Sequence, residues 1–508
     1  MPADLTRREF LHATGGLAWR PQPGPQPTET AGIVPAPRYL RPSGLVSGVL
    51  GPETPVWIGE SLRASEHSWA PRPLLRKLRE KPPIQPAVLS GADAQLPSPC
   101  VLIGSARDHR LLAALSERLS PKLGLPSGQG LGEGYLLETG QHGIRLVAET
   151  PAGVFYGAQT ALQLLSGEGA LAAAEVADAP LAGFRGVHAR VTDPAGLPPL
   201  HRFVREVMPR HKANVLLAEV NYHFRFRSHP EIAEQTMLSE ADARELARLC
   251  RENNVRLIPL LNCFSHQSWR DSVHGLLRAY PQFNETPCKT GVLFYAWCAS
   301  DPRIAPIVCE LIDELTTAFE TQAVHLGMDE VIEIAQCPFC RRKSPAELFA
   351  KVVNEFHAHV VGRRGLEMLI WGDRLIDGRK TPYNPMNGSR NGTHPALHMI
   401  PKDILLCDWH YHLHDSYPSV QMFAEAGFDF VACGWQNPQA IRAFQAYARR
   451  HGGRRYRGYL ATNWSPFVRI ARYLTEGVLE ESVAAEVRNF AHCFQLGMEL
   501  AWAGAARQ

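Results

Sequence analysis

A pair of adjacent acids at the end of an apolar run is the feature of this sequence most suited to chemistry. The run 324–328 leads directly into Asp329 and Glu330. Because the chain turns where a strand ends, both carboxylates could project into one pocket. Crowded carboxylates push their pKa values apart, so that one stays protonated as a general acid and the other stays ionised. Cleavage of a glycosidic bond needs one protonated and one ionised carboxyl. Alternatively, the two acids serve only to stabilise the N-terminus of a helix electrostatically.

The composition limits the class of protein. At 508 residues the chain exceeds one ordinary domain and fits a large barrel with a smaller companion domain. With 45% hydrophobic residues and a formal net charge of +3, it can bury a sizeable core and shows no polyanion-binding surface. We therefore expect no nucleic-acid partner. The eleven scattered cysteines do not form a disulfide framework, so some thiols should be free.

The first 32 residues predict targeting rather than fold. Arg7 and Arg8 precede a moderately apolar stretch through Trp19, which resembles a bacterial twin-arginine export signal. We expect a periplasmic or secreted protein, the alternative being a disordered tail on a cytoplasmic one. No later segment approaches the roughly 20 uninterrupted apolar residues that span a bilayer.

The alternation of β-like runs and helical stretches along the sequence predicts two domains. Residues 33–170 alternate short β-like runs with helices and end in an apolar helix at 153–165, as in a small α/β domain. An Ala/Glu/Gly-rich link, 166–182, follows. Residues 183–508 then contain eight short β-like runs: 184–191, 215–220, 256–261, 323–327, 368–371, 404–409, 428–435 and 459–464. Most are separated by amphipathic helices, which predicts a (β/α)8 TIM barrel; only 378–398 reads as a loop.

The ends of these runs are polar and aromatic. Active sites of such barrels form at the C-terminal ends of the strands. Aromatic faces that stack on a pyranose, together with amides and carboxylates for its hydroxyls, suit a sugar pocket, although tryptophans can also simply fill a barrel rim. The candidate residues at these ends are Asn221, His266, Trp371, Asp373, Trp409, Tyr411, Trp435 and Trp464.

On these motifs the chain resembles the family 20 glycoside hydrolases, the β-N-acetylhexosaminidases, from about residue 33 to 464. The family pattern His-any-Gly-Gly-Asp-Glu appears as 325–330, with Met328 in place of the second glycine. Weaker matches are Glu133-Gly134-Tyr135, Arg185-Gly186, Ser265-His266 and Trp371-Gly372-Asp373. The resemblance implies a barrel with an N-terminal α/β domain, an amino-sugar glycoside as substrate, and no cofactor or catalytic metal.

The resemblance also implies a mechanism. The substrate's own 2-acetamido oxygen attacks the anomeric carbon, so that no protein nucleophile is needed. Glu330 would be the general acid and base, and Asp329 would orient and stabilise the acetamido group. Arg185 would grip sugar hydroxyls, and Trp371, Trp409 and Trp464 would enclose the ring. His266 and His325 would support the pair, although a buried hydrogen-bonding role in the barrel core is an equal alternative for His325.

Several departures leave the substrate open. Arg190 stands where the family has an aspartate, and Asn221-Tyr222-His223 stands in place of a carboxylate after the second strand. Ser465-Pro466 replaces a hydroxyl-binding glutamate, and the seventh-strand tyrosine is missing, for which Tyr411 is the candidate substitute. A glycosidase of another specificity and a non-catalytic carbohydrate-binding relative therefore remain alternatives.

Two other patterns suggest metals. Cys337-Pro338-Phe339-Cys340, with Cys288 and Cys298, could form a four-thiolate zinc site or a disulfide-braced loop, of which we favour disulfides or free thiols. His410, His412 and His414 alternate and would align on one face of a strand, as in a metallohydrolase. Such a site needs ligands from elsewhere, so we favour a solvated or hydroxyl-binding cluster. The oligomeric state is not predicted.

Overall fold

The computed structural model describes residues 32–504 apart from 43–46, 52–53, 63–69, 79–86, 89–93, 126–128, 167–168 and 270–271. The twin-arginine motif lies outside the described residues, so export stays a prediction. Within the described part, no helix is both long and apolar enough to cross a membrane.

The apolar runs of the second half form a closed barrel of eight parallel strands, so the predicted (β/α)8 fold is confirmed. Each expected run supplies one strand, and β19 pairs with β10 to close the ring. The strands are β10 (Phe184–Arg190), β11 (Val215–Glu219), β12 (Arg256–Leu260), β15 (Ala323–His325), β16 (Glu367–Trp371), β17 (Leu405–Trp409), β18 (Phe430–Gly434) and β19 (Tyr456–Ala461).

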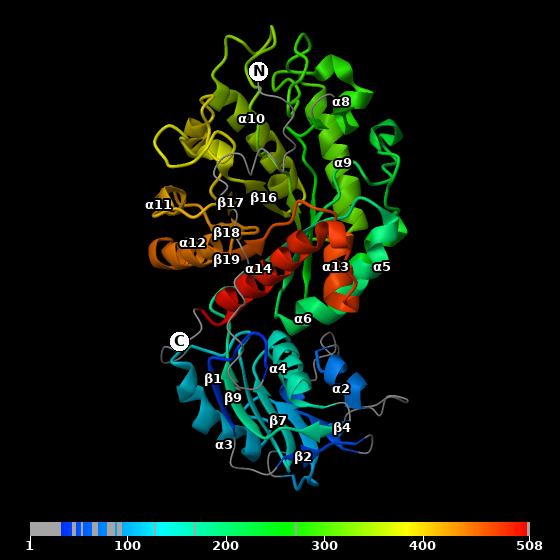
Figure 1. Ribbon diagram of the computed structural model, residues 1–508, viewed down its shortest axis with the longest axis vertical. Helices are drawn as coiled ribbons and strands as arrows, with labels where there is room; N and C mark the ends of the chain where they lie inside the picture. Colours follow the sequence, from blue (N-terminus) through cyan, green and yellow to red (C-terminus); the bar gives the residue numbers. More distant parts are fainter. Residues whose placement is uncertain are drawn as a thin grey trace. The chain divides into compact units, whose positions relative to one another are not determined.

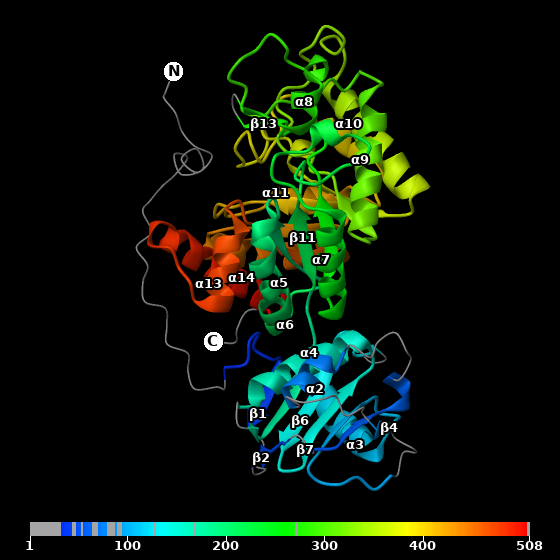
Figure 2. The same cartoon turned by 90° about the vertical axis from the view of Figure 1, so that its right-hand side faces the viewer.

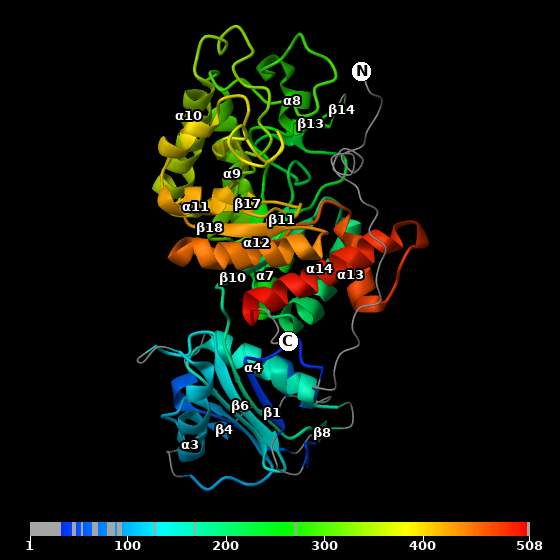
Figure 3. The ribbon, with the colours of Figure 1, turned by 60° about the vertical axis from the view of Figure 1, so that its left-hand side comes forward.

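Helices surround this barrel, and Figure 3 shows α11 and α12 alongside β17 and β18. Their apolar stripes face the strands, and α7 begins with a capping box between Ser239 and Asp242. Between β16 and β17 the described chain has only short 3₁₀ turns, as the loop prediction required. The helices are α5 (Leu197–Arg202), α6 (Met208–Arg210), α7 (Glu240–Glu252), α8 (Gly275–Ala279), α9 (Ile304–Ala318), α10 (Pro345–His357), α11 (Pro418–Glu425), α12 (Pro438–His451), α13 (Phe467–Glu476) and α14 (Ala484–Trp502).

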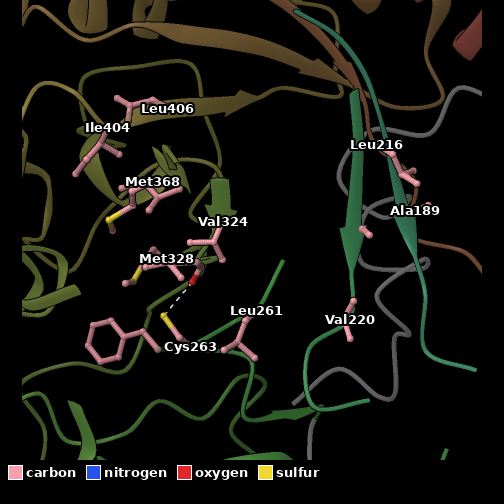
Figure 4. Packing of buried hydrophobic residues seen from close by; sticks show 14 of the residues in the cluster. Ala189, Leu216, Val220, Leu261, Cys263, Val324, Met328, Met368, Ile404 and Leu406 are labelled. Carbon is pink, nitrogen blue, oxygen red and sulfur yellow. Dashed lines mark hydrogen bonds between the residues drawn. The ribbon is translucent and has the colours of Figure 1, made fainter. Parts of the chain in front are cut away.

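The barrel strands are buried on both sides, which explains their continuous apolar runs. Along β15, Ala323 packs inside the barrel, whereas Val324 packs in the layer between strands and helices. Figure 4 shows members of this outer layer, among them Val324, Met328 and Met368. The inner layer is closed by aromatic residues toward the C-terminal strand ends, including Trp371 and Trp409.

The N-terminal α/β unit is built on a seven-stranded mixed sheet of order β1-β9-β6-β7-β5-β3-β4. Helix α4 (Pro151–Leu164) packs on one face and α3 (Arg110–Leu119) on the other, and α2 (Arg72–Leu78) lies beside α4 (Figure 2). The strands are β1 (Tyr39–Pro42), β3 (Val56–Ile58), β4 (Ala87–Val88), β5 (Cys100–Gly104), β6 (Tyr135–Gly140), β7 (Gly143–Ala148) and β9 (Ala174–Asp178); two further pairs join β2 (Gly48–Val49) to β8 (Ala170–Leu171) and β13 (Ser268–Trp269) to β14 (Ser272–Val273).

The sheet extends further along the chain than we expected. Strand β9 lies inside the segment 166–182 that reads as a link, and it pairs antiparallel with both β1 and β6. Its alanine-rich sequence carries a weak strand signal, and its neighbours in the sheet supply the stability. The sheet therefore ends at Asp178 rather than near residue 170.

After the barrel closes, α13 and α14 follow β19 (Figure 1, orange-red to red). Helix α14 packs on β10 and β19. At its end, Trp502 donates a hydrogen bond from Nε1 to Asp178 Oδ2 at 2.9 Å. The same carboxylate binds Lys212 Nζ at 2.6 Å, and both members of this ion pair are fully buried. A fully buried ion pair is stabilising only when its geometry is good, so these contacts fix how the first sheet meets the barrel.

Candidate active site

Asp329 and Glu330 lie just past the end of β15, and each is only 3% exposed. Three residues of this turn have a left-handed backbone, with φ of 69° at Gly327, 73° at Met328 and 51° at Glu330. Left-handed residues break the strand alternation, which lets neighbouring side chains point the same way. The turn thus brings both carboxylates to one place, as the sequence predicted for a catalytic pair.

Gly327 and Met328 meet the demands of this left-handed turn in different ways. A Cβ on Gly327 would stand 2.0 Å from Asn262 Oδ1, so only glycine fits there. Met328 adopts a conformation that costs a side-chain-bearing residue roughly 1 kcal/mol. Its side chain is 1% exposed and packs near Val324 and Cys263 in the outer layer (Figure 4). This apolar burial offsets the backbone cost, which accounts for methionine where the resembled motif has glycine.

His266 joins the two carboxylates. Its Nε2 lies 3.1 Å from Asp329 Oδ2 and 3.1 Å from Glu330 Oε2. Burial lowers the pKa of His266, but the charges and hydrogen bonds of the two acids outweigh burial and raise that pKa to about 10. The imidazole is therefore a cation at neutral pH. The Phe294 ring packs against the imidazole, with centroids 4.1 Å apart and the ring planes tilted by 43°.

The spacing of these three groups defines what they can do. Their ligand atoms all lie within 4.8 Å of one another, close enough to share protons or a cation. Among the described residues, a second group with this property is Glu285 with Cys298, Cys337 and Cys340, which does not include the acid pair.

Asp373, two residues past the end of the neighbouring strand β16, supports the pair. Its Oδ2 accepts hydrogen bonds from the Glu330 backbone N–H at 3.0 Å and from Arg374 Nε at 2.6 Å. Trp409 Nε1 donates to its Oδ1 at 3.3 Å. Burial raises the pKa of Asp373 to about 6, against the opposing charge of Arg374. Three donors favour the ionised form, so Asp373 is a carboxylate at neutral pH and anchors the Glu330 backbone.

The predicted tryptophans gather at the same strand ends. Trp371 and Trp464 have centroids 5.9 Å apart, and Trp409 and Tyr411 have centroids 5.2 Å apart. Tyr411 links the two sets, because its hydroxyl accepts a hydrogen bond from Trp464 Nε1 at 2.9 Å. Trp435 lies 5.6 Å from Tyr411, edge to face. The structure therefore brings together all five aromatic residues singled out from the sequence.

The side chains of His325 and Asn221 both accept hydrogen bonds from backbone N–H groups of the protein. His325 is fully buried, its Nδ1 accepts the Gly327 N–H at 3.0 Å, and its ring lies 4.6 Å from Trp371. It thus holds the turn that carries the acids. Asn221 Oδ1 accepts the Asn262 N–H at 2.9 Å, which ties the end of β11 to that of β12.

Sequence reasoning missed a histidine–glutamate pair in the barrel mouth. His188 Nε2 lies 2.9 Å from Glu219 Oε2, and both side chains are buried. His188 also lies 4.8 Å from the Trp464 ring, and Glu219 Oε1 lies 3.5 Å from Arg190 Nε. A carboxylate is therefore present at the end of β11 after all, inside the strand rather than after it. A single acid near the end of an otherwise apolar run was the available signal.

The predicted role of Arg185 is wrong. Arg185 is the second residue of β10 and thus lies at the N-terminal end of the barrel, away from the mouth. Its fully buried guanidinium donates to the carbonyls of Ala182 and Lys212 and to the Tyr156 hydroxyl, and pairs with Glu133 Oε2 at 2.8 Å. With its donors directed at these groups, Arg185 joins the barrel to the N-terminal unit and does not bind sugar.

The alternating histidines do not form a metal-binding face. Strand β17 ends at Trp409, so 410–414 lack the strand geometry that the hypothesis required. His410 is buried and contacts Asp408 Oδ1 at 2.9 Å, Ser419 Oγ at 3.0 Å and Asn387 Nδ2 at 3.2 Å. Neither group of the described residues that could hold a metal ion includes these histidines.

Comparison with known proteins identifies the family. The model of glycosyl hydrolase family 20, domain 2, matches residues 30–179, and that of the family 20 catalytic domain matches residues 211–439. The chain belongs to glycosyl hydrolase family 20. Among curated relatives, a lacto-N-biosidase of Bifidobacterium bifidum is 22% identical over 50% of this chain and 23% of its own length. A β-hexosaminidase of Porphyromonas gingivalis is 20% identical over 49% of this chain, but the chain covers only 37% of that protein.

Solved structures of this family share the fold. A chitobiase of Flavobacterium johnsoniae superposes with a TM-score of 0.63 at 16% identity, over 92% of this chain and 72% of that one. A β-N-acetylhexosaminidase of Bacteroides fragilis superposes with a TM-score of 0.64 at 14% identity, over 94% of this chain and 92% of that one. At these identities the likeness establishes the two-part architecture, and function has to be argued from the site.

Proposed function

We propose that this family 20 protein is a retaining glycosidase that removes terminal β-linked N-acetylhexosamine by a substrate-assisted mechanism. The observation that carries the proposal is the placement of Asp329 and Glu330 together on one histidine among the aromatic strand ends. An inverting pair stands about 6.5–9.5 Å apart to admit a water between them. Here one oxygen of each carboxylate lies within 4.8 Å of the other, which favours a mechanism without that water.

In the first half-reaction, the protonated Glu330 gives its proton to the glycosidic oxygen as the bond to the aglycone breaks. The acetamido carbonyl oxygen attacks the anomeric carbon from the opposite face and forms a cyclic oxazolinium ion. Asp329 accepts the acetamido N–H and balances the developing positive charge, which is most effective in a buried position. Because the nucleophile belongs to the substrate, it starts within reach of the reacting carbon.

In the second half-reaction, Glu330 acts as a base. It takes a proton from water, which attacks the anomeric carbon from the face that the aglycone left. The ring opens, the acetamido group is restored, and two inversions give net retention. His266 and Asp373 are positioning residues in both halves, since one holds the two carboxylates and the other the Glu330 backbone.

The choice of an acetamido sugar rests on two further observations. Trp371, Trp409 and Trp464 provide apolar faces beside the acids, suited to a sugar ring and its methyl-bearing substituent. The two curated relatives are named lacto-N-biosidase and β-hexosaminidase, and both names indicate enzymes that act on amino-sugar glycosides. Arg190 and Glu219 are the charged groups best placed to select among hydroxyl configurations.

The test compares hydrolysis of aryl β-N-acetylglucosaminide, β-N-acetylgalactosaminide and plain β-glucoside by wild type, Asp329→Asn and Glu330→Gln. We expect activity on acetamido sugars only, and a loss of about 10²–10⁴-fold in each variant. Glu333→Gln is the matched control, because Glu333 lies three residues on and pairs with Lys289 at 2.8 Å outside the site. Activity on the plain glucoside that survives Asp329→Asn would support a glycosidase of another specificity. Product binding without hydrolysis would support a carbohydrate-binding relative.

A further inference from the structure

Four buried side chains with metal-binding atoms converge beyond the acid pair. They are Glu285, Cys298, Cys337 and Cys340, and their ligand atoms all lie within 4.8 Å of one another. Cys298 Sγ lies 3.4 Å from Cys337 Sγ and 3.5 Å from Cys340 Sγ. Neither the glycosidase mechanism nor the family resemblance uses this cluster.

The local backbone presents these groups inward. Glu285 and Cys298 flank an isolated antiparallel bridge between Asn284 and Trp297, with Glu285 N–H donating to Ala296 O and Cys298 N–H to Phe283 O. Cys337 and Cys340 lie in a tight turn in which the carbonyl of Cys337 accepts the N–H groups of Cys340 and Arg341. A turn of this kind, with two intervening residues, brings both sulfurs to one side of the chain.

One ligand atom is conspicuously unpartnered. Glu285 is 1% exposed, and its Oε1 accepts the Gln336 N–H at 2.8 Å. Its Oε2 is buried and has no hydrogen-bond partner among the described residues. A buried carboxylate oxygen without a donor costs free energy unless a cation occupies its other side.

We propose that Cys298, Cys337, Cys340 and Glu285 bind one structural zinc ion. Three thiolates and a carboxylate make a four-ligand set of the kind that zinc binds tetrahedrally. With zinc–sulfur bonds of about 2.3 Å, sulfurs in a tetrahedral site stand roughly 3.8 Å apart, close to the separations of 3.4 and 3.5 Å found here. Binding would release the thiol protons to solvent.

The alternatives explain fewer of these contacts. A disulfide would join two of the three sulfurs and leave the third thiol and the Glu285 carboxylate buried without a counter-ion. The sequence grouped Cys288 with the other cysteines, but Cys288 is exposed and lies outside the cluster. Glu285 takes its place, which changes a weak four-cysteine pattern into a complete mixed site.

The proposed zinc ion would lie between two loops of the candidate active site. Cys337 and Cys340 lie on the segment that follows Glu330, whereas Glu285 and Cys298 lie on the excursion that follows His266. Zinc would therefore clamp together the two loops that carry the acid pair and its bridging histidine. A structural metal of this kind contributes directly to the stability of the loops it joins.

The experiment measures metal in the full chain. Protein expressed with zinc and purified without metal-chelate chromatography is analysed by mass spectrometry of its elements, and we expect about one zinc per chain. Cys337→Ser/Cys340→Ser should lose it, whereas Cys288→Ser, the matched control, should keep it. Cobalt substituted into wild type should give the visible absorption bands of a tetrahedral thiolate site, a readout that does not require the variants to fold.

Three results would overturn the proposal. Wild type could lack zinc and fail to take up cobalt, peptide mapping under non-reducing conditions could show a disulfide from Cys298 to Cys337 or Cys340, or Cys288→Ser could lose zinc as fully as the double variant. The metal content is independent of hydrolysis, so failure of the glycosidase proposal would leave this test unaffected.

Discussion

The charge on His266 should set the pH at which the acid pair works. Burial lowers the pKa of His266, but the charges and hydrogen bonds of Asp329 and Glu330 outweigh burial and raise that pKa from its ordinary 6.5 to about 10. Replacing His266 by the neutral glutamine removes this positive charge from beside the two acids, so we expect the pH range of activity to move upward.

The assay is the pH dependence of kcat/KM on an aryl β-N-acetylglucosaminide. Catalysis needs Asp329 ionised and Glu330 protonated, so the acid and alkaline limbs report the two carboxyls. In His266→Gln both limbs should move to higher pH by about one unit, together with a lower maximum. His357→Gln is the control, because His357 also pairs with a carboxylate, Asp403 at 2.8 Å, but at the far end of α10.

The same shift has a consequence for stability. A histidine with a raised pKa stabilises the fold fully below about pH 6.5 and loses that contribution as pH rises toward 10. Wild type should therefore lose more thermal stability between pH 7 and 9.5 than His266→Gln does. If His266→Gln lowers kcat but leaves both limbs of the pH profile at their wild-type pH, the electrostatic role of His266 is refuted. Its role would then be steric only.

Two further substitutions test the turn and the buried ion pair. Gly327→Ala should abolish most activity and lower Tm, because its Cβ would meet Asn262 Oδ1 at 2.0 Å. Gly365→Ala has a similar φ of 65° but open space around it, so it should show only the backbone cost of about 1 kcal/mol, and equal effects in both would remove the steric argument. Lys212→Ala removes the cationic partner of the fully buried Asp178 carboxylate and should destabilise the protein by about 3–5 kcal/mol in denaturant unfolding. Lys351→Ala breaks an exposed pair and should cost under about 1 kcal/mol; comparable losses would argue against a buried anchor.

The barrel was predictable because its strands are buried on both faces and therefore read as continuous apolar runs. The acid pair was visible for the same reason, since two carboxylates interrupt such a run at its end. Strand β9 was missed because its alanines carry little strand preference and depend on pairing with β1 and β6.

The errors about Arg185 and Glu219 arose because the position of each residue along its strand was not taken into account. Arg185 is the second residue of its run, and this alone places it at the N-terminal end of the barrel, opposite the mouth. Glu219 is the last residue of β11 and lies at the mouth, although only the residues after the apolar run 215–220 were considered. Glu285 could not be assigned from sequence, because the loop that carries it has no periodicity to show which residues it brings near Cys298.

The most direct test of the central claim is the product formed by Glu330→Ala with an activated aryl β-N-acetylglucosaminide in the presence of azide. Without the acid/base, a good leaving group still departs, and azide can attack the oxazolinium ion because it needs no base. We expect azide to restore the rate and nuclear magnetic resonance to show the β-glycosyl azide. An α-azide, or no restoration at all, would contradict Glu330 as the acid/base of a substrate-assisted, retaining reaction.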